Sequence, residues 1–221
     1  HGGPGAGGEM APVARRLSMR FGVIEPIQTA DSVDGQVGEL ADHIRHWAAF
    51  PAVLVGFSWG AWLVFILAAR HPDLVGKLIL VSSGPFSPQY AEGILETRLG
   101  RLDPSDRAEA ESLMGSLSPP GDKDPAAFAR LGALFEKADA HDPVDTDFPD
   151  LIPRPDLFHQ VFPEAAAMRR DGTLPALGHE IRCPAVAIHG DADPHPAAGV
   201  EGPLATVLTD FRFILLPRCG H

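Results

Sequence analysis

The chain has 221 residues, of which 45% are hydrophobic and 21% charged, and its formal net charge is −11 at pH 7. These proportions are typical of a soluble globular protein, and the length suffices for one large domain with a substantial core. The negative charge argues against nucleic acid and membrane surfaces as partners, because little here could neutralise a row of phosphates. We expect a small-molecule substrate and leave the oligomeric state open.

No apolar stretch is long enough to cross a bilayer. The longest, from Ala61 to Ala69, falls far short of the roughly 20 residues that a spanning helix needs. No signal peptide is visible, so a cytoplasmic location is the default expectation. Cys183 and Cys219 are too few for a disulfide framework, and we expect about a strand length between them. Both are interpreted as free thiols in a reducing compartment.

The first part of the chain alternates predicted strands and helices. Strands are predicted over 21–27, 52–55 and 77–82, and helices over 35–50 and 59–70. The run over 52–55 is fully apolar, which is typical of a buried parallel strand. The first of the helices has one apolar stripe, made of Val37, Leu40, Ala41, Ile44, Trp47 and Ala48. This alternation predicts a parallel sheet with helices on both faces.

The alternation stops at about Pro85, and residues 85–177 show several helical segments without a convincing strand. Asp103-Pro104 and Asp124-Pro125 are each typical of an N-cap followed by proline at the first helical position. Another short helix is predicted over 163–170. The stretches 118–121 and 142–155 are expected to be irregular links.

Strand patterns resume over 185–188 and 211–216. We therefore divide the chain into an α/β core, residues 1–84 and 178–221, and an inserted helical cap, residues 85–177.

The segment Gly56-Phe57-Ser58-Trp59-Gly60 has the pattern G-x-S-x-G between a predicted buried strand and an apolar helix. That context is typical of a nucleophile elbow, which lifts the serine hydroxyl above the sheet. The flanking glycines avoid steric conflict with neighbouring backbone. A glycine-rich turn with an incidental serine is the alternative. We interpret Ser58 as the candidate catalytic nucleophile.

A serine hydroxyl needs a base to take its proton, and His221 is the candidate because it follows the last predicted strand. The alternative is a solvated terminal histidine. The orienting acid is expected after the preceding strand, where Asp191 and Asp193 stand. We favour Asp193, because Asp191 lies closer to the strand and is better suited to bracing the turn. The order Ser58, Asp193, His221 is one of the known chain orders of such triads.

The opening segment His1-Gly2-Gly3-Pro4-Gly5 predicts a loop whose glycines let backbone N–H groups approach an oxyanion. We expect the N–H groups of Gly3 and Trp59 to be the donors. The loop lacks the Lys-Ser/Thr ending of a nucleotide-binding loop, so phosphate binding is disfavoured. A metal site is the other alternative, with four candidate ligands: His189, Asp191, Asp193 and His195. Their spacing matches no recognised pattern, so we expect neither metal nor cofactor.

Together these motifs resemble the α/β-hydrolase superfamily over nearly the whole chain. The resemblance implies the α/β-hydrolase fold, with a mostly parallel sheet, flanking helices and an inserted helical cap. It also implies Ser58 as nucleophile, Asp193 as acid and His221 as base. Within the superfamily, H-G-G-P-G with S-W-G is similar to the proline iminopeptidase group. Where that group carries Asp-Gln-Arg-Gly, this chain reads Glu25-Pro26-Ile27-Gln28.

Proline iminopeptidases also use cap carboxylates to hold the amino terminus of the substrate. The candidates for that role here are Glu92, Glu96, Glu109, Glu111, Glu136 and Glu164. The resemblance further implies that N-terminal strands and a C-terminal helix are missing. A sheet that lacks its third strand would have a vacant slot beside a strand over 21–27, so we predict that the sequence is a fragment of a longer protein.

The sequence thus predicts a serine hydrolase that cleaves an ester, amide or related acyl bond of a small, mostly uncharged substrate. The alternatives are a proline iminopeptidase-like aminopeptidase and, from another class, a ligand-binding protein that keeps the fold without turnover. Six aromatic residues of the predicted cap either shape an apolar acyl pocket or form the core of the cap: Phe86, Tyr90, Phe128, Phe135, Phe158 and Phe162.

Overall fold

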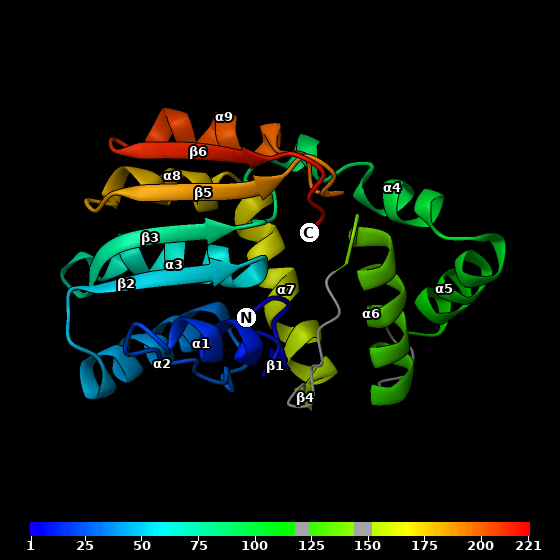
Figure 1. The fold of residues 1–221 in the computed structure, drawn as a ribbon, viewed down its shortest axis with the longest axis horizontal. Helices are drawn as coiled ribbons and strands as arrows, with labels where there is room; N and C mark the ends of the chain where they lie inside the picture. The colour runs from blue at the N-terminus through cyan, green and yellow to red at the C-terminus, as the bar shows by residue number, and fades with distance from the viewer. Residues whose placement is uncertain (118–123, 144–151) are drawn as a thin grey trace.

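The computed structural model describes residues 1–117, 124–143 and 152–221. The predicted link 118–121 and most of the link 142–155 lie outside these residues. Four parallel strands form one sheet in the order β2-β3-β5-β6. Their bounds are Ala52–Phe57 for β2, Val75–Val81 for β3, Ala185–Gly190 for β5 and Phe211–Leu216 for β6. All four carboxyl ends meet at one edge of the sheet (Figure 1).

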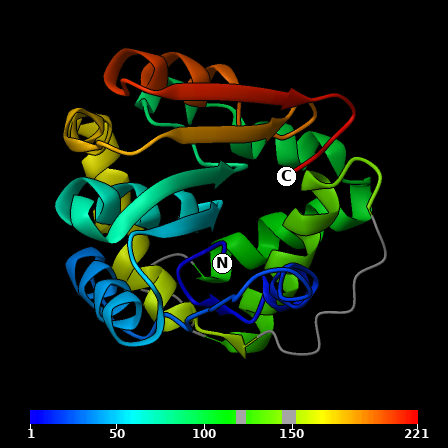
Figure 2. The ribbon, with the colours of Figure 1, turned by 60° about the vertical axis from the view of Figure 1, so that its left-hand side comes forward.

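The register places one row of residues straight across the sheet. Leu54 lies opposite Leu78, Leu78 opposite Ala185, and Ala185 opposite Phe211. The strands predicted around residues 54, 78, 186 and 213 are therefore confirmed. Figure 2 shows that both ends of the chain, marked N and C, lie near the carboxyl edge of this sheet. That edge is where a parallel sheet gathers functional groups.

Nine helices accompany the sheet in the described residues. Their bounds are Ala11–Leu17 (α1), Val33–Trp47 (α2), Trp59–Arg70 (α3), Ile94–Arg101 (α4), Pro104–Leu117 (α5), Pro125–Asp139 (α6), Pro155–Arg170 (α7), Thr173–Ala176 (α8) and Ala198–Val207 (α9). Three short 3-10 turns lie over Pro72–Leu74, Pro88–Tyr90 and Leu177–Glu180.

Helix α3 forms the centre of the core. It packs on β2 and β3, and Phe65, Ile66 and Leu67 on it are fully buried. A helix that is apolar on every side has to be covered on every side. The amphipathic α2 lies against α3, with the Ser32 side chain accepting the N–H of Gly35 as its N-cap.

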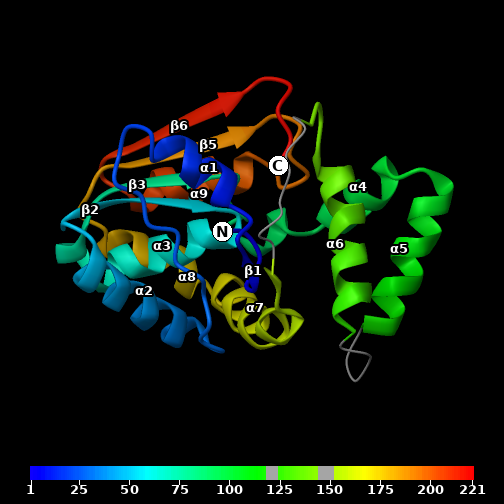
Figure 3. The same ribbon diagram turned by 60° about the horizontal axis from the view of Figure 1, so that its bottom comes forward.

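Helices α4, α5 and α6 form a block beyond the carboxyl edge of the sheet, and we call them the helical block (Figures 1 and 3). They share a small apolar cluster of their own, made of Leu102, Ala110, Leu134 and Ala138 with Leu99, Leu113 and Leu131 around it. The two predicted N-caps are confirmed. The Asp103 carboxylate accepts the N–H groups of Ser105 and Asp106, and the Asp124 carboxylate accepts that of Ala126.

Helix α7 begins at Pro155, whereas the sequence predicted a helix that begins at Pro163. The pattern was misleading because proline is rare inside a helix, yet α7 continues through Pro163. Val161 and Ala165 on either side of it are buried in the main core, and this packing outweighs the local preference. Residues 155–176 therefore pack with the sheet layers, while the limits of the predicted cap stay a prediction.

The predicted strand over 21–27 is wrong, because residues 22–30 have no regular secondary structure. Phe21 and Ile27 are 65% and 52% exposed, and Pro26 has no N–H to offer to a neighbouring strand. The predicted vacant slot is wrong for the same reason. The four described strands are hydrogen-bonded neighbours, so the sheet has no internal gap. That the sequence belongs to a longer protein stays a prediction.

Two predictions of burial are also wrong. Strand β2 is an edge strand, and Val53 and Val55 on it are 59% and 49% exposed. Alternate residues of a strand point to opposite faces, and α3 covers only the face that carries Leu54. Trp47 in the last turn of α2 is 68% exposed, because it lies at the edge of the apolar stripe.

Cys183 lies two residues before β5 and Cys219 lies beyond the end of β6, as predicted, and both are free thiols. Among the described helices, none combines the length and the apolar character needed to span a bilayer.

The core makes a stability prediction. Leu78 is fully buried in the middle of the sheet, whereas Leu95 on α4 is 43% exposed. We expect Leu78→Ala to lower the free energy of unfolding by about 2–5 kcal/mol, because it leaves a cavity among packed side chains. The matched change Leu95→Ala should cost less than about 1 kcal/mol. Urea unfolding measures both, and equal losses would contradict this description of the core.

Candidate active site

Ser58 stands on a sharp turn between β2 and α3. Its φ is 52° and its ψ is −114°, a region that residues with a side chain rarely adopt. A Cβ atom at Gly56 would lie 2.3 Å from the Gly60 carbonyl oxygen. At Gly60 a Cβ atom would lie 2.7 Å from the His1 carbonyl oxygen. Glycine is therefore required on both sides of the turn, in agreement with the predicted elbow.

The structure brings together the three residues that the sequence singled out as a triad. The Ser58 hydroxyl oxygen lies 3.0 Å from Nε2 of His221, and Nδ1 of His221 lies 2.8 Å from Oδ2 of Asp193. Ser58 follows β2, Asp193 follows β5 and His221 follows β6, so each comes from the carboxyl end of a different strand. The ring of Phe57 packs beside that of His221, with 5.0 Å between their centroids.

Asp193, and not Asp191, contacts the histidine. Asp193 is buried, whereas Asp191 is exposed and its N–H donates to the Leu216 carbonyl. Burial by itself would raise the pKa of Asp193. Hydrogen bonds from His195 and His221, together with the charges of both rings, outweigh burial and hold this pKa far below its usual range. The carboxyl group is therefore ionised at neutral pH.

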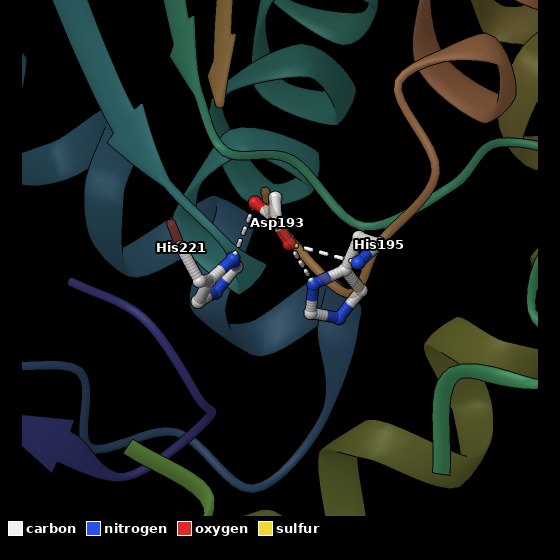
Figure 4. Close-up of side chains that lie close together, drawn as sticks. All are labelled: Asp193, His195 and His221. Carbon is white, nitrogen blue, oxygen red and sulfur yellow. Dashed lines mark hydrogen bonds and ion pairs between the residues drawn. The ribbon is translucent and has the colours of Figure 1, made fainter. Parts of the chain in front are cut away.

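His195 is a contact that sequence reasoning missed, since it had been considered only as a metal ligand. Its backbone N–H and its ring Nδ1 both lie 2.8 Å from Oδ1 of Asp193. Asp193 thus lies between two imidazoles, as Figure 4 shows. Burial lowers the pKa of His195, the Asp193 carboxylate opposes that effect, and nearby His221 and Arg98 add to it.

The loop that carries Asp193 is braced from the strand below. Nε2 of the fully buried His189 lies 2.8 Å from the His195 carbonyl oxygen. The candidate metal-ligand atoms of Asp193, His195 and His221, two ring nitrogens and a carboxylate oxygen, lie within 4.8 Å of one another. That spacing by itself would suit a metal ion. Because both Nδ1 atoms already face the carboxylate, we interpret the group as a hydrogen-bonded chain.

The candidate oxyanion donors lie on two segments. Trp59 is the first residue of α3, where backbone N–H groups have no acceptor within the helix, and its indole N–H donates to buried Gln28 and Gln36. Gly3 has a φ of +35°, a conformation suited to glycine. Among the described residues, neither the Gly3 N–H nor the Trp59 N–H has a backbone or side-chain acceptor.

Three contacts fix the loop that carries Gly3, and the sequence predicted none of them. Glu9 accepts the N–H of Gly2 at 2.6 Å, and burial raises the pKa of this carboxyl group while the hydrogen bond opposes it. Strand β1 (Ala6–Gly7) pairs antiparallel with β4 (Ile152–Pro153), and the Arg154 N–H donates to the Gly5 carbonyl. The loop is thereby tied to the chain that follows the helical block.

The aromatic residues of the predicted cap lie in different surroundings, and a role in an acyl pocket stays a prediction. Phe86 is fully buried in the main core, beside Phe65 and Trp62. The half-buried rings of Phe128, Phe158 and Phe162 form a chain of contacts between α6 and α7. Phe135 lies under the guanidinium of Arg98. Tyr90 packs close to Gly199.

The candidate cap carboxylates also lie in different surroundings. Glu109 and Glu111 pair with arginines on the surface of the helical block, and Glu164 accepts the first N–H of α2. Burial, and then the charge of Glu9, raise the pKa of Glu136.

Comparison with known proteins supports the same fold. A family model described as "alpha/beta hydrolase fold" matches residues 50–150. Pimeloyl-[acyl-carrier protein] methyl ester esterase of Chromobacterium violaceum is 28% identical, over 97% of this chain and 82% of its own length. 2-(Acetamidomethylene)succinate hydrolase of Mesorhizobium japonicum is 24% identical, over 95% and 75%. The crystal structure of VinJ superposes with a TM-score of 0.68 at 18% identity, covering this whole chain and 81% of VinJ. The chain has the α/β-hydrolase fold.

The low pKa of Asp193 makes a prediction about stability and pH. An unfolded aspartate titrates near pH 4, and the folded pKa lies below that, so the ionised carboxylate stabilises the fold fully above about pH 4. That contribution is lost as the pH falls further. We expect the difference in unfolding free energy between wild type and Asp193→Asn to shrink by roughly 1 kcal/mol per unit below about pH 4. Urea titrations between about pH 5 and 2.5 measure it, and a constant difference would contradict the argument.

Proposed function

We propose that this chain is the catalytic part of a serine hydrolase that cleaves an ester or related acyl bond of a small, mostly uncharged substrate. One observation carries the proposal, namely the continuous contact from Asp193 through His221 to Ser58. The fold supports it, because the serine stands on a strained turn at the start of a helix.

In the proposed acylation step, the Ser58 oxygen attacks the carbonyl carbon while Nε2 of His221 takes the hydroxyl proton. Asp193 keeps the other ring nitrogen protonated and stabilises the imidazolium that forms. As the tetrahedral intermediate collapses, His221 returns the proton to the leaving alcohol or amine. The acyl group then remains bonded to Ser58.

In the proposed deacylation step, His221 takes a proton from water, whose oxygen attacks the acyl carbon. The carboxylic acid leaves and the proton returns to Ser58. Both tetrahedral intermediates carry a negative oxygen, for which the N–H groups of Gly3 and Trp59 are the candidate donors. A donor of this kind is worth about 10²–10³ in rate.

The pairing of one nearby cation gives no support for an anionic substrate. Arg98 lies close enough to His195 to influence its pKa, and the Asp139 carboxylate accepts two hydrogen bonds from the Arg98 guanidinium. The charge of Arg98 is therefore already balanced by Asp139, which favours a mostly uncharged substrate over an anionic one. The esterase and hydrolase names of the two curated relatives favour acyl hydrolysis over ligand binding without turnover.

Labelling with a fluorophosphonate tests the nucleophile on the full-length protein. We expect stoichiometric labelling of wild type and none of Ser58→Ala, because the probe reacts only with an activated serine. Asp193→Asn should slow labelling by about 10³-fold or more. The exposed Ser105 on α5 provides the control, and Ser105→Ala should label like wild type. Absent labelling of wild type, or labelling unchanged in Ser58→Ala, would favour the non-catalytic alternative.

The bond type is tested with chromogenic substrates. We expect cleavage of short-chain p-nitrophenyl esters, because the proposed site combines an activated serine with candidate oxyanion donors. Proline p-nitroanilide is the comparison. Faster turnover of the anilide than of the esters would favour the proline iminopeptidase-like alternative, and with it a cap carboxylate such as Glu136 as a ligand for the substrate amine.

A further inference from the structure

The backbone of His221 is held by the helical block. Its N–H donates to the carbonyl oxygen of Asp139 at 3.0 Å. Asp139 is the last residue of α6, where the final carbonyl groups have no donor within the helix. The contact therefore satisfies a free end of α6 and joins it to the candidate base. Figures 1 and 3 both show the chain end marked C beside this end of α6.

Gly220 shows how closely the two segments lie. A Cβ atom there would be 2.3 Å from the Asp139 carbonyl oxygen and 2.8 Å from the backbone nitrogen of His141. These distances are too short for any side chain, so only glycine fits at position 220. A shift of the last turn of α6 would consequently move the backbone of His221 directly.

The side chain of Asp139 fixes that last turn. Nε of Arg98 donates to Oδ1 at 2.7 Å and Nη2 donates to Oδ2 at 2.5 Å, while Arg101 donates to the Ala138 carbonyl. Both side chains of the pair are largely buried, at 21% exposure for Arg98 and 9% for Asp139. A bidentate pair constrains orientation as well as distance, so α4 determines where α6 ends.

The ring of His221 is already held from the other side by Asp193 and Phe57. We propose that Arg98 and Asp139 are positioning residues for the base, since their ion pair holds the carbonyl that holds the His221 backbone. The inference rests on the proposed function. Displacement of a catalytic base by about 1 Å can lower the reaction rate by about 10²-fold. Loss of this contact should therefore be measurable as a slower reaction.

The test measures fluorophosphonate labelling rates of the full-length protein. We expect Asp139→Asn to slow labelling by about tenfold or more, because it breaks the charge pair and frees the end of α6. Asp139→Asn also leaves Arg98 buried without a counter-charge, so Arg98→Lys, which keeps the charge but loses the fork, is measured beside it and should slow labelling by a smaller factor. Arg130→Gln is the matched control. It breaks an exposed two-bond pair with Glu109 in the same helical block, and should label at the wild-type rate.

A second measurement separates positioning from simple loosening of the helical block. With a p-nitrophenyl ester that wild type cleaves, we expect kcat to fall in Asp139→Asn and Arg98→Lys while KM changes less than twofold. Labelling rates and kcat equal to wild type in both variants would overturn the inference, and so would a rise in KM with unchanged kcat. Absent labelling of wild type would instead refute the proposed function.

Discussion

The candidate site depends on one buried carboxylate. A charge inside a protein is costly unless donors surround it, and Asp193 is buried in a loop where His195 and His221 supply those donors. The same hydrogen bonds that make the charge tolerable also fix the ring of His221 in one orientation. That orientation points Nε2 at Ser58. Burial, charge and geometry are thus parts of one arrangement.

The parallel sheet makes this arrangement possible. Ser58 and His221 are 163 positions apart in the sequence, yet each follows a strand whose carboxyl end lies at the same edge. Side chains on the loops at that edge can therefore meet, although the loops lie far apart in the sequence. The continuous order β2-β3-β5-β6 sets the spacing between the loops, so a core substitution in the sheet can affect the site at a distance.

The sequence was informative where local chemistry decides the structure. Short sequence patterns predict the elbow around Ser58 and the N-caps at Asp103 and Asp124. In each case the pattern has a direct physical explanation in the local backbone geometry and hydrogen bonding. The choice of Asp193 over Asp191 as the partner of His221 also agrees with the geometry.

What the sequence could not predict depends on contacts between distant segments. The extended-looking stretch 21–27 needs a neighbouring strand, and local pattern says nothing about whether one is there. The contacts of Asp139 could not be predicted because they use a backbone carbonyl, which every residue possesses. The pairing of β1 with β4 could not be predicted either, because a strand of two residues is too short to have a recognisable sequence pattern. His195 alone offered a signal, as a ring two residues from a predicted acid.

The helical block and the chain that follows it are attached to the site at two places. The last residue of α6 holds His221 through the Asp139 carbonyl, and the chain that follows the block holds the glycine loop through β4 and Arg154. An engineered chimera that replaced this block with one from a related protein would therefore inherit new attachments on either side of the serine. Transferring specificity by such an exchange would require grafting both points of attachment, at residues 139–141 and 152–154, together with the helices that precede them.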